Sequence, residues 1–516
     1  MFRNKRFINN HLASCFFLLI VSLPYNNLKT QTTTILFKNF VVIDGTGNKA
    51  EIKDVRIKND KITLIGSLLP QSGETIIDGM NHLILAPGFI DTHSHHSRNL
   101  EDSTQFSSFL CQGITTLIVG QDGSSNLPLQ SYFNDVIKTG LPVNLASYIG
   151  HNTIRYEVMG NENFNRLATP SEIKKMKAIV RKEMKSGALG LSTGLEYDPG
   201  IFSSKDEVMQ LALVAARRDG RYISHIRSED INLESAVEEI IEIGRRTKMP
   251  VQISHIKIAM KQKWGKANEI IATLNNARKE GINISADIYP YDFWLSDLEV
   301  QFPKRDFDNK ASAEFALREL APPDGMILSK YDANPAWVGK SIAEIAVEIN
   351  KDPADTYMYL IRLAHDKKAD ESVMGRSMAE TDIVTLMQWP YTNICSDGFG
   401  GGRHPRGVGS FPRVLHHYVK ELHAFNMEEA IRKMTLLSAE HMGIEHRGKI
   451  AHEYQADLVI IDPDRISDKS SLQDPFALSE GINGVWVNGI QVWKENKFLG
   501  PKPGKLIKNS RYASNK

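Results

Sequence analysis

The stretch Pro87-Gly88-Phe89-Ile90-Asp91-Thr92-His93-Ser94-His95 is a short apolar run that ends in two histidines. Side chains alternate along a β-strand, so His93 and His95 are expected on one face, where two imidazoles can hold the same cation. Two histidines this close also occur in surface loops that bind no metal. Six further apolar runs along the chain also stop at a His, an Asp or a glycine-rich turn, and this repetition favours a metal site.

A regular alternation of strand and helix patterns surrounds this stretch. Helical patterns at 171–186 and 233–247 carry apolar residues three and four positions apart. The pattern predicts an α/β fold with a (β/α)8 TIM-like barrel. An open doubly wound sheet is the alternative, but a Gly-x-Gly-x-x-Gly after the first strand is absent. The eight expected strands lie at 83–95, 115–120, 143–150, 188–194, 222–227, 251–257, 283–291 and 393–398.

The two ends of the chain show a different pattern. Short β-rich runs alternate with turns over 33–86 and again over 444–508. We predict one small β-sandwich domain formed from both ends, with the barrel at 87–443 between them; two unrelated β-appendages are the alternative.

About a hundred residues separate the last two expected strands of the barrel. We expect a helical insertion at about 295–390 there, with a turn at 322–330, that could overhang the barrel mouth.

The composition limits the classes of molecule that the protein could bind. The 516 residues carry a formal net charge of +1, and no basic block stands apart from compensating acids in the body of the chain, which argues against nucleic acid as a partner.

A basic head precedes the apolar segment 12–23, so a signal peptide is expected at 1–24 and the mature protein is expected to be exported, to the periplasm. An uncleaved N-terminal anchor is the alternative, and membrane contact is expected only through that segment. Cys111 and Cys395 are expected to be buried small hydrophobes.

Polar residues gather where the predicted strands end, which is where a barrel of this kind places its chemistry. His225 and His255 each follow Ile-Ser in near-identical strands and are expected to be metal ligands. Asp397 precedes a glycine-rich turn, where a carboxylate could accept a proton from bound water and later donate it to a leaving group. Imidazole and carboxylate together suit zinc or a similar divalent ion. The strand-end residues are His93, His95, Asp122, His151, Glu196, Tyr197, His225, His255, Asp287, Tyr289 and Asp397.

Several motifs resemble those of the N-acyl-D-amino-acid deacylases (D-aminoacylases) of the amidohydrolase superfamily, over about residues 35–505. The stretch 87–95 resembles the superfamily's first-strand signature. The motifs more specific to the deacylases are Gly113-Ile114-Thr115-Thr116, Gly190-Leu191-Ser192-Thr193-Gly194-Leu195-Glu196-Tyr197, Ser254-His255-Ile256-Lys257, Asp287-Ile288-Tyr289-Pro290-Tyr291, and His404-Pro405-Arg406 followed by Phe411-Pro412-Arg413-Val414-Leu415.

The resemblance implies a zinc-dependent hydrolase, with one or two zinc ions, that cleaves the amide of an N-acylated D-amino acid. By match to the family pattern, His225 and His255 would hold the principal zinc. His93 and His95 would lie at a second, weaker position. Asp397 would be the general base and acid.

The same resemblance implies that Tyr197, Lys257, Tyr289 and Arg406 hold the substrate carboxylate. Phenol, ammonium and guanidinium groups are donors that fit an anion. His151 could steady the developing oxyanion, although a buried core histidine is an equally good interpretation of that position.

The chain departs from the family at one metal position. Many relatives carry Gly-Asn-Cys-Gly after the second strand, with the cysteine as a ligand, whereas this chain has Gly120-Gln121-Asp122-Gly123. A carboxylate is a harder ligand and can bridge two ions. We therefore predict that Asp122 binds metal and favours a second ion more than a cysteine would. His96-Ser97 also replaces the acidic pair that commonly follows His-x-His.

Other functions remain open from the sequence. One is a dipeptidase acting on peptides with a C-terminal D-residue, and another is a cyclic-amide hydrolase of the dihydroorotase or hydantoinase kind. The latter enzymes usually bridge their metals with a modified lysine on the fourth strand, and Leu189-Gly190-Leu191-Ser192-Thr193 contains no lysine. A third candidate is an inactive exported binding protein, which the full set of candidate ligands argues against. Export would suit cell-wall or peptide fragments with D-residues as substrates.

Overall fold

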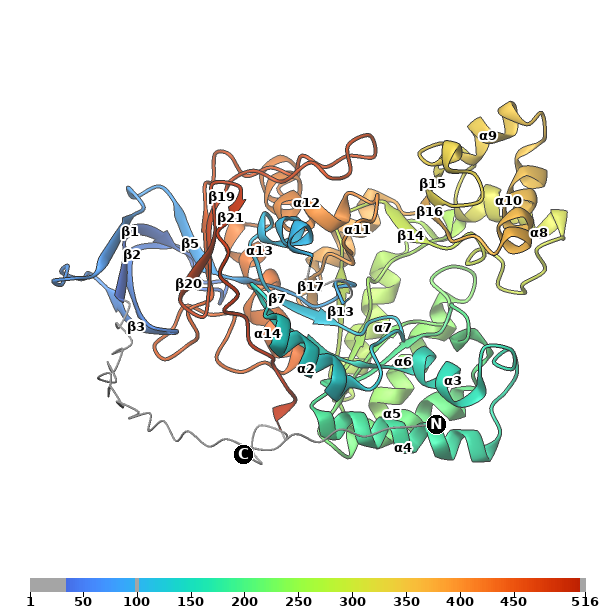
Figure 1. The fold of residues 1–516 in the computed structure, drawn as a ribbon, viewed down its shortest axis with the longest axis horizontal. Coiled ribbons are helices and arrows are strands. Elements are labelled where there is room, and N and C mark those ends of the chain that lie inside the picture. Colours follow the sequence, from blue (N-terminus) through green and yellow to red (C-terminus); the bar gives the residue numbers. More distant parts are fainter. Residues whose placement is uncertain (1–33, 98–101, 511–516) are drawn as a thin grey trace, which may run out of the picture.

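The computed structural model describes residues 34–97 and 102–510 and shows a mixed α/β protein (Figure 1). A β-sheet lies at one side, parallel strands with helices form the centre, and a smaller α+β unit lies at the opposite side. The expected signal peptide at 1–24 lies outside the described residues. No helix in the described part of the chain combines the length and the apolar character needed to cross a membrane.

Strands from both chain ends share one mixed sheet, in the order β21-β20-β19-β18-β5-β1-β2-β3 with β4 beside β1. The rings of Phe37 and Trp486 lie 5.0 Å apart, although three ladder steps separate β1 from β19. A flat sheet would hold those strands about 14 Å apart, so this sheet curls around its own apolar core. The strands are β1 Thr34–Val42, β2 Glu51–Lys58, β3 Lys61–Gly66, β4 Thr75–Asp78, β5 Ile84–Pro87, β18 Leu458–Ile461, β19 Ile482–Val487, β20 Ile490–Lys494 and β21 Lys497–Phe498.

Parallel ladders order the central strands as β6-β7-β8 and as β9-β10-β11-β12-β13-β17. Only Tyr148 separates β8 from β9, and a parallel bridge joins Ser94, beyond β6, to Gly398, beyond β17. Nearly every residue of these strands is buried, as expected for parallel strands covered on both faces. The strands are β6 Phe89–Asp91, β7 Ile114–Val119, β8 Asn144–Ser147, β9 Ile149–Gly150, β10 Gly190–Gly194, β11 Arg221–His225, β12 Val251–Ile253, β13 Ile284–Ile288 and β17 Thr392–Ile394.

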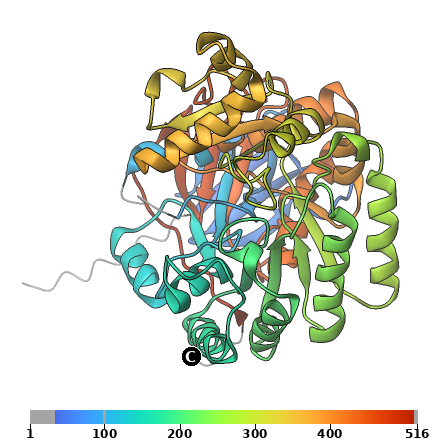
Figure 2. The same ribbon diagram turned by 90° about the vertical axis from the view of Figure 1, so that its right-hand side faces the viewer.

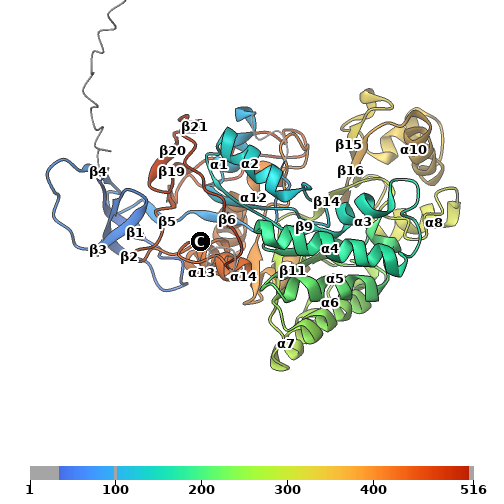
Figure 3. The ribbon, with the colours of Figure 1, turned by 60° about the horizontal axis from the view of Figure 1, so that its bottom comes forward.

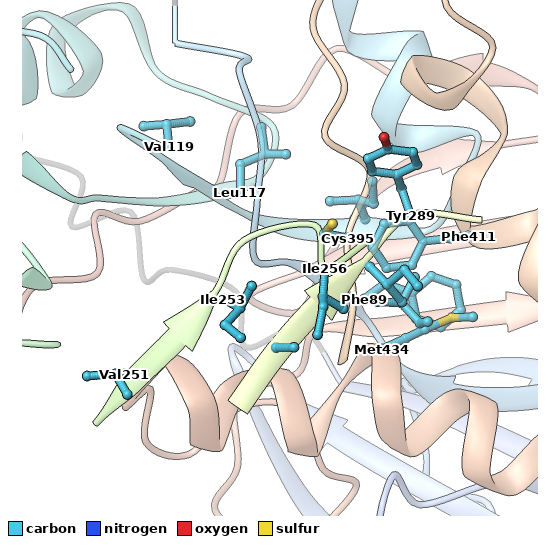
Figure 4. Close-up of a cluster of buried hydrophobic side chains, with 14 of the residues drawn as sticks. Phe89, Leu117, Val119, Val251, Ile253, Ile256, Tyr289, Cys395, Phe411 and Met434 are labelled. Atoms are coloured by element: carbon cyan, nitrogen blue, oxygen red, sulfur yellow. The ribbon is translucent and has the colours of Figure 1, made fainter. Parts of the chain in front are cut away.

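The expected first strand at 83–95 is divided in the structure. Its first part, β5, pairs in the terminal sheet, and its second part, β6, pairs with β7. The division falls at Gly88, where a Cβ atom would lie 2.2 Å from the side chain of Thr115. The chain therefore passes between the two sheets at a point where only glycine fits. Just beyond it, Phe89 stacks on Phe411 in the apolar core beneath the strand ends (Figure 4).

Helices follow most of the parallel strands and cover them on the outside (Figure 3), with α4, α5, α6 and α7 side by side. Local sequence explains α4 well, because Thr169 and Glu172 form a capping box, Pro170 occupies the first turn and Gly187 ends the helix with φ +109°. The helices are α1 Phe106–Leu110, α2 Leu129–Thr139, α3 His151–Met159, α4 Pro170–Ser186, α5 Lys205–Ala216, α6 Leu233–Thr247, α7 Ala267–Lys279, α11 Glu380–Gln388, α12 Arg406–Arg413, α13 Met427–Met434 and α14 Leu436–Met442.

The insertion before β17 is not purely helical, which corrects the sequence-based expectation. It contains an antiparallel sheet in the order β14-β16-β15, and the expected turn at 322–330 overlaps β15. The sheet joins segments distant in sequence, so no local periodicity reveals it. A separate core that includes Phe302 and Tyr357 packs its helices. The insertion lies at the top of the view in Figure 2. The elements are β14 Phe293–Ser296, α8 Lys310–Phe315, β15 Met326–Tyr331, α9 Ile342–Glu348, α10 Pro353–Lys367 and β16 Glu371–Arg376.

Candidate metal centre

The carboxyl ends of the parallel strands bring four predicted ligands together. His93 Nε2 lies 3.2 Å from Asp122 Oδ2 and 3.4 Å from Asp397 Oδ1. His95 Nε2 lies 3.3 Å from Asp122 Oδ2 and 3.0 Å from Asp397 Oδ1. These residues follow β6, β7 and β17, so the two histidines and two carboxylates form one compact group of cation ligands.

A second group adjoins the first and shares Asp122 with it. His225 Nδ1 lies 3.1 Å from His255 Nε2, which lies 3.4 Å from Asp122 Oδ1. The Asp122 carboxylate thus turns Oδ2 toward the His93 pair and Oδ1 toward the His225 pair. A carboxylate with this orientation can bridge two ions.

The spacing of these atoms fits zinc. Two nitrogen or oxygen ligands at about 2.1 Å from a tetrahedral zinc lie about 3.4 Å apart, and the separations above range from 3.0 to 3.4 Å. Asp122 Oδ1 is also buried and forms no hydrogen bond with the described residues. An imidazole and carboxylate set with a free, buried oxygen suits a divalent cation.

The backbone is unusual at the same residues. Asp122, His255 and Asp397 have φ values of +52°, +33° and +50°, in the left-handed region that favours glycine. Strained residues of this kind cluster at functional sites, because the surrounding structure must hold them there. The positive φ values therefore support a role for these side chains beyond packing.

Two glutamates position the second histidine pair. Glu196 Oε2 lies 2.9 Å from His225 Nε2, and Glu229 Oε1 lies 2.9 Å from His255 Nδ1. Each imidazole thereby turns one nitrogen toward the group of ligands and donates the other N–H to a carboxylate, the usual arrangement for a metal-binding histidine. Glu196 was predicted at a strand end without a role, and Glu229 was not predicted as a site residue. No periodicity in the sequence indicates Glu229, because the chain between His225 and Glu229 is neither helix nor strand.

Electrostatics at the site favour a bound cation. Burial lowers the pKa of His95, but Asp122 and Asp397 outweigh it and raise that pKa to about 9. Burial likewise raises the pKa of Asp397, but Arg406 and His93 outweigh it and hold the carboxylate ionised. Burial lowers the pKa of His225 to about 4, which keeps that imidazole neutral as a metal ligand requires. The carboxylates thus supply negative charge that a metal ion would balance.

The four residues predicted to hold the substrate carboxylate line one hollow next to these ligands, which we call the inner hollow. Tyr197, Lys257, Tyr289 and Arg406 all face it, and the Tyr289 hydroxyl is buried with no hydrogen-bond partner in the described structure. Arg406 lies 2.7 Å from Asp397 Oδ2 and sits over the Tyr289 ring. Apolar walls come from the insertion, which therefore closes one side of the site: Trp294, Leu295, Val300 and Leu320.

A second, outer hollow continues from the inner one and shares Tyr197, Leu295, Ser296, Asp397 and Arg406 with it. Its remaining wall is mostly polar and comes from the segments after β6, β7, β10 and β17, from helix α3 and from the insertion. The residues specific to it include Asp122, Asn126, Asn152, Tyr156, Asp198, Asp297 and Ser372. Asp397 and Arg406 therefore lie where two connected hollows meet, the inner one with apolar walls and the outer one with mostly polar walls.

His151 does not join the site, which corrects its predicted catalytic role. It is the first residue of α3 and is fully buried, with Nε2 2.8 Å from Glu207 Oε1. Arg155 Nη1 donates to both oxygens of the same glutamate. His151 lines neither hollow. The helix begins directly after the strand and turns this side chain into the packing between α3 and α5.

Comparisons with known proteins agree with this site. Residues 384–493 match the Amidohydrolase family. The D-aminoacylase of Alcaligenes xylosoxydans xylosoxydans is 30% identical over 93% of this chain and 98% of its own length. The N-acyl-D-glutamate deacylase of the same organism is 30% identical over 90% of this chain and 95% of its own length. A crystal structure of N-acyl-D-glutamate deacylase from Bordetella bronchiseptica, with zinc and a phosphonate inhibitor, superposes with a TM-score of 0.83 at 30% identity, covering 92% of this chain and 99% of that one.

The fold and the clustered ligands define a protein of the metal-dependent amidohydrolase class. Within that class, the identity over nearly the whole chain shows that this protein belongs to the D-aminoacylase family of deacylases. A D-hydantoinase structure superposes with a TM-score of 0.55 at 15% identity, which shows only a shared fold.

Proposed function

We propose that this protein hydrolyses the amide bond of N-acyl-D-amino acids to a carboxylate and a free D-amino acid. The observation that carries the proposal is the position of Asp397, whose Oδ1 faces the ligand histidines while Oδ2 pairs with Arg406. Membership of a family with D-aminoacylase and N-acyl-D-glutamate deacylase activities supports the same reaction.

His225, His255 and Asp122 would hold one zinc ion, and His93, His95, Asp122 and Asp397 would hold a second. A zinc ion bound there would polarise the scissile carbonyl and lower the pKa of a water molecule. Asp397 would accept the proton of the attacking water and deliver it to the leaving nitrogen. The hydroxyl of the water ends on the acyl carbon and its proton on the amine, as the C–N bond breaks.

The substrate carboxylate would lie in the inner hollow against Arg406, Lys257 and the two tyrosines. Lys257 pairs with Glu229 and Arg406 with Asp397, so both cations are held in place before substrate arrives. The apolar walls of the same hollow suit an uncharged D side chain such as that of leucine. The buried Tyr289 hydroxyl would gain a partner when the carboxylate binds.

We also propose the finer architecture and the location. The parallel ladders and the Ser94–Gly398 bridge support a closed (β/α)8 barrel, and the curled sheet of both chain ends supports a sandwich-like companion domain. The domains would be 33–86 with 444–508, and the barrel at 87–443. The basic head and apolar segment support a signal peptide at 1–24 and export to the periplasm.

The test is hydrolysis of paired N-acetyl-D-leucine and N-acetyl-L-leucine by the mature protein, before and after chelation and after zinc return. We expect zinc-dependent release of leucine from the D-substrate only. Bound zinc without release from either substrate would refute the deacylase proposal and favour a cyclic-amide substrate. Absence of bound zinc would favour the binding-protein alternative.

A further inference from the structure

A further cavity, of about 320 Å³, lies at the opposite end of the parallel strands from the metal centre. We call it the amino-end cavity, because strands begin at its walls: Arg221 is the first residue of β11, Val251 is the first of β12, and Tyr391 directly precedes β17. The candidate metal ligands lie at the carboxyl ends of the strands, and none of them lines this cavity. Its volume is typical of a small-molecule site, for which about 300–1,000 Å³ is usual.

The amino-end cavity is basic. Arg221, Arg278 and Arg432 line it, and Glu440 is the one carboxylate among the residues that form its walls. Arg432 already pairs with Glu429 at 2.7 Å. Neither Arg221 nor Arg278 forms an ion pair with any residue that the structure describes, and burial lowers the pKa of the Arg221 guanidinium because no carboxylate opposes it. Two guanidinium groups of this wall therefore have no counterion within the described protein.

The same two guanidinium groups have unused hydrogen-bond donors. Arg221 Nη1 donates to the carbonyl of His441 at 2.9 Å, and Arg278 Nη1 donates to the carbonyl of Ile284. A guanidinium carries five N–H groups, and each of these makes one hydrogen bond with the described residues. Arg278 Nε is moreover buried with no partner among them. A buried donor of this kind is costly unless an ion or a water molecule accepts its hydrogen bond.

The ends of two helices explain only part of this arrangement. Arg278 lies in the last turn of α7, and Arg221 contacts the last turn of α14 through His441, where cations offset the helix dipole. Those contacts use one N–H of each guanidinium and leave Arg278 Nε unexplained. The cation is also held in a fixed plane, because its central carbon lies 3.4 Å from the centre of the Tyr391 ring.

The electrostatics of the cavity favour an anion. Burial, to which Arg221 and Arg278 add, lowers the pKa of His441 to about 3. Nearby positive charge thus opposes protonation of this imidazole, which stays neutral at physiological pH. The same positive charge would stabilise an anion that enters the cavity.

We propose that the amino-end cavity binds a phosphate group, either as free phosphate or as the phosphate monoester of a small molecule. Guanidinium groups match pairs of phosphate oxygens, and a doubly charged phosphate balances Arg221 and Arg278 together. At about 30 Å³ for each water molecule, the cavity has room for roughly ten waters. This is more than the five heavy atoms of a phosphate fill, so an organic group fits beside it. The site is independent of the proposed deacylase function.

The experiment is isothermal titration calorimetry of the zinc-loaded mature protein with inorganic phosphate, with glucose 6-phosphate and with glucose as the uncharged control. The buffer holds chloride and a pH of about 7.5, at which a phosphate monoester is mostly doubly charged. We expect saturable binding of at least one of the two phosphates and none of glucose. Tighter binding of the ester would identify a phosphorylated small molecule as the ligand, and tighter binding of inorganic phosphate would identify the free ion.

Substitution of Arg278 tests where the phosphate binds. Arg278→Gln should raise the Kd for phosphate at least about tenfold, because it removes a charged donor, and Arg278→Lys, which keeps the charge without the planar group, should raise it less. Arg245→Gln is the matched control, because Arg245 lies in the last turn of the neighbouring helix α6 and does not line the cavity. It should leave the Kd unchanged, and circular dichroism checks that all three variants fold.

A crystal of the natural protein soaked in the tighter-binding phosphate gives a second readout that needs no variant. We expect the phosphate between Arg221 and Arg278. Absence of binding by calorimetry would overturn the proposal. So would a phosphate that binds Arg278→Gln as tightly as the natural protein, or that lies at the metal centre in the crystal. None of these results bears on the deacylase function, which the leucine substrates test separately.

Discussion

Lys257 Nζ lies 2.7 Å from both carboxylate oxygens of Glu229. The same carboxylate lies 2.9 Å from Nδ1 of the metal-ligand candidate His255. One buried glutamate thus links a residue that would bind substrate to a residue that would bind zinc. Since removing one member of a buried charged group leaves the others uncompensated, Glu229 should influence both functions.

We predict that Glu229→Gln weakens zinc binding by roughly 10- to 100-fold, because the neutral amide no longer stabilises His255 through its Nδ1–H. KM for N-acyl-D-leucine should rise as well, since Lys257 loses the carboxylate that holds it. Competition with a chelator measures the zinc affinity. Glu242→Gln, at a half-buried carboxylate of α6 that pairs with Arg245 and lines neither hollow, is the control and should change neither quantity. Unaltered zinc affinity in Glu229→Gln would refute the positioning role.

Asp397→Asn should lower kcat by roughly 10²- to 10⁴-fold, the usual contribution of a positioned acid and base. The variant should fold and keep the zinc held by His225 and His255, because neither of those residues contacts Asp397 directly. Metal analysis and circular dichroism of the same variant, measured together with its rate, distinguish loss of catalysis from loss of zinc or of folding. Near-normal turnover would show that another group moves the proton.

The sequence predicted the parallel strands and most of the site, because those features are local. The repeated Ile-Ser-His predicted His225 and His255 as ligand candidates, although His255 lies beyond the end of β12. His93 and His95 come together as expected, but β6 ends at Asp91, so the alternation of a strand is not what brings them together. The β14-β16-β15 sheet could not be predicted in this way, since its strands pair across tens of residues. His151 was misjudged for a different reason: a position at a strand end does not fix the direction of a side chain when a helix begins there.

His151 should therefore matter for stability instead of turnover. His151→Ala removes a buried partner of Glu207 and should lower the free energy of unfolding by about 1–3 kcal/mol, the cost of an unsatisfied buried group. Arg155 still pairs with Glu207 in the variant, so we expect the protein to fold. Denaturant unfolding and steady-state kinetics give the two readouts. A large loss of kcat with unchanged stability would restore the oxyanion role predicted from the sequence.

The last prediction concerns the number of metal ions. Asp122 directs Oδ2 to within 3.2 Å of His93 Nε2 and Oδ1 to within 3.4 Å of His255 Nε2, so one side chain serves both groups of ligands. Asp122→Ala should therefore reduce the zinc bound per chain at every free zinc concentration. Asp122→Cys should keep the zinc ion held by His225 and His255 but weaken binding of the ion held by His93 and His95. A thiolate offers one soft sulfur atom in place of two carboxylate oxygens, so it serves the two ions less equally.

Equilibrium dialysis of the two variants against a series of free zinc concentrations, followed by elemental analysis, measures both occupancies without reference to activity. Two ions in the natural protein, fewer in Asp122→Ala and a weakened second ion in Asp122→Cys would establish Asp122 as the shared ligand. Full metal content in Asp122→Ala would contradict that role. The Asp122 φ of +52° would then require another explanation, because a strained residue with no ligand to hold has no evident reason to persist.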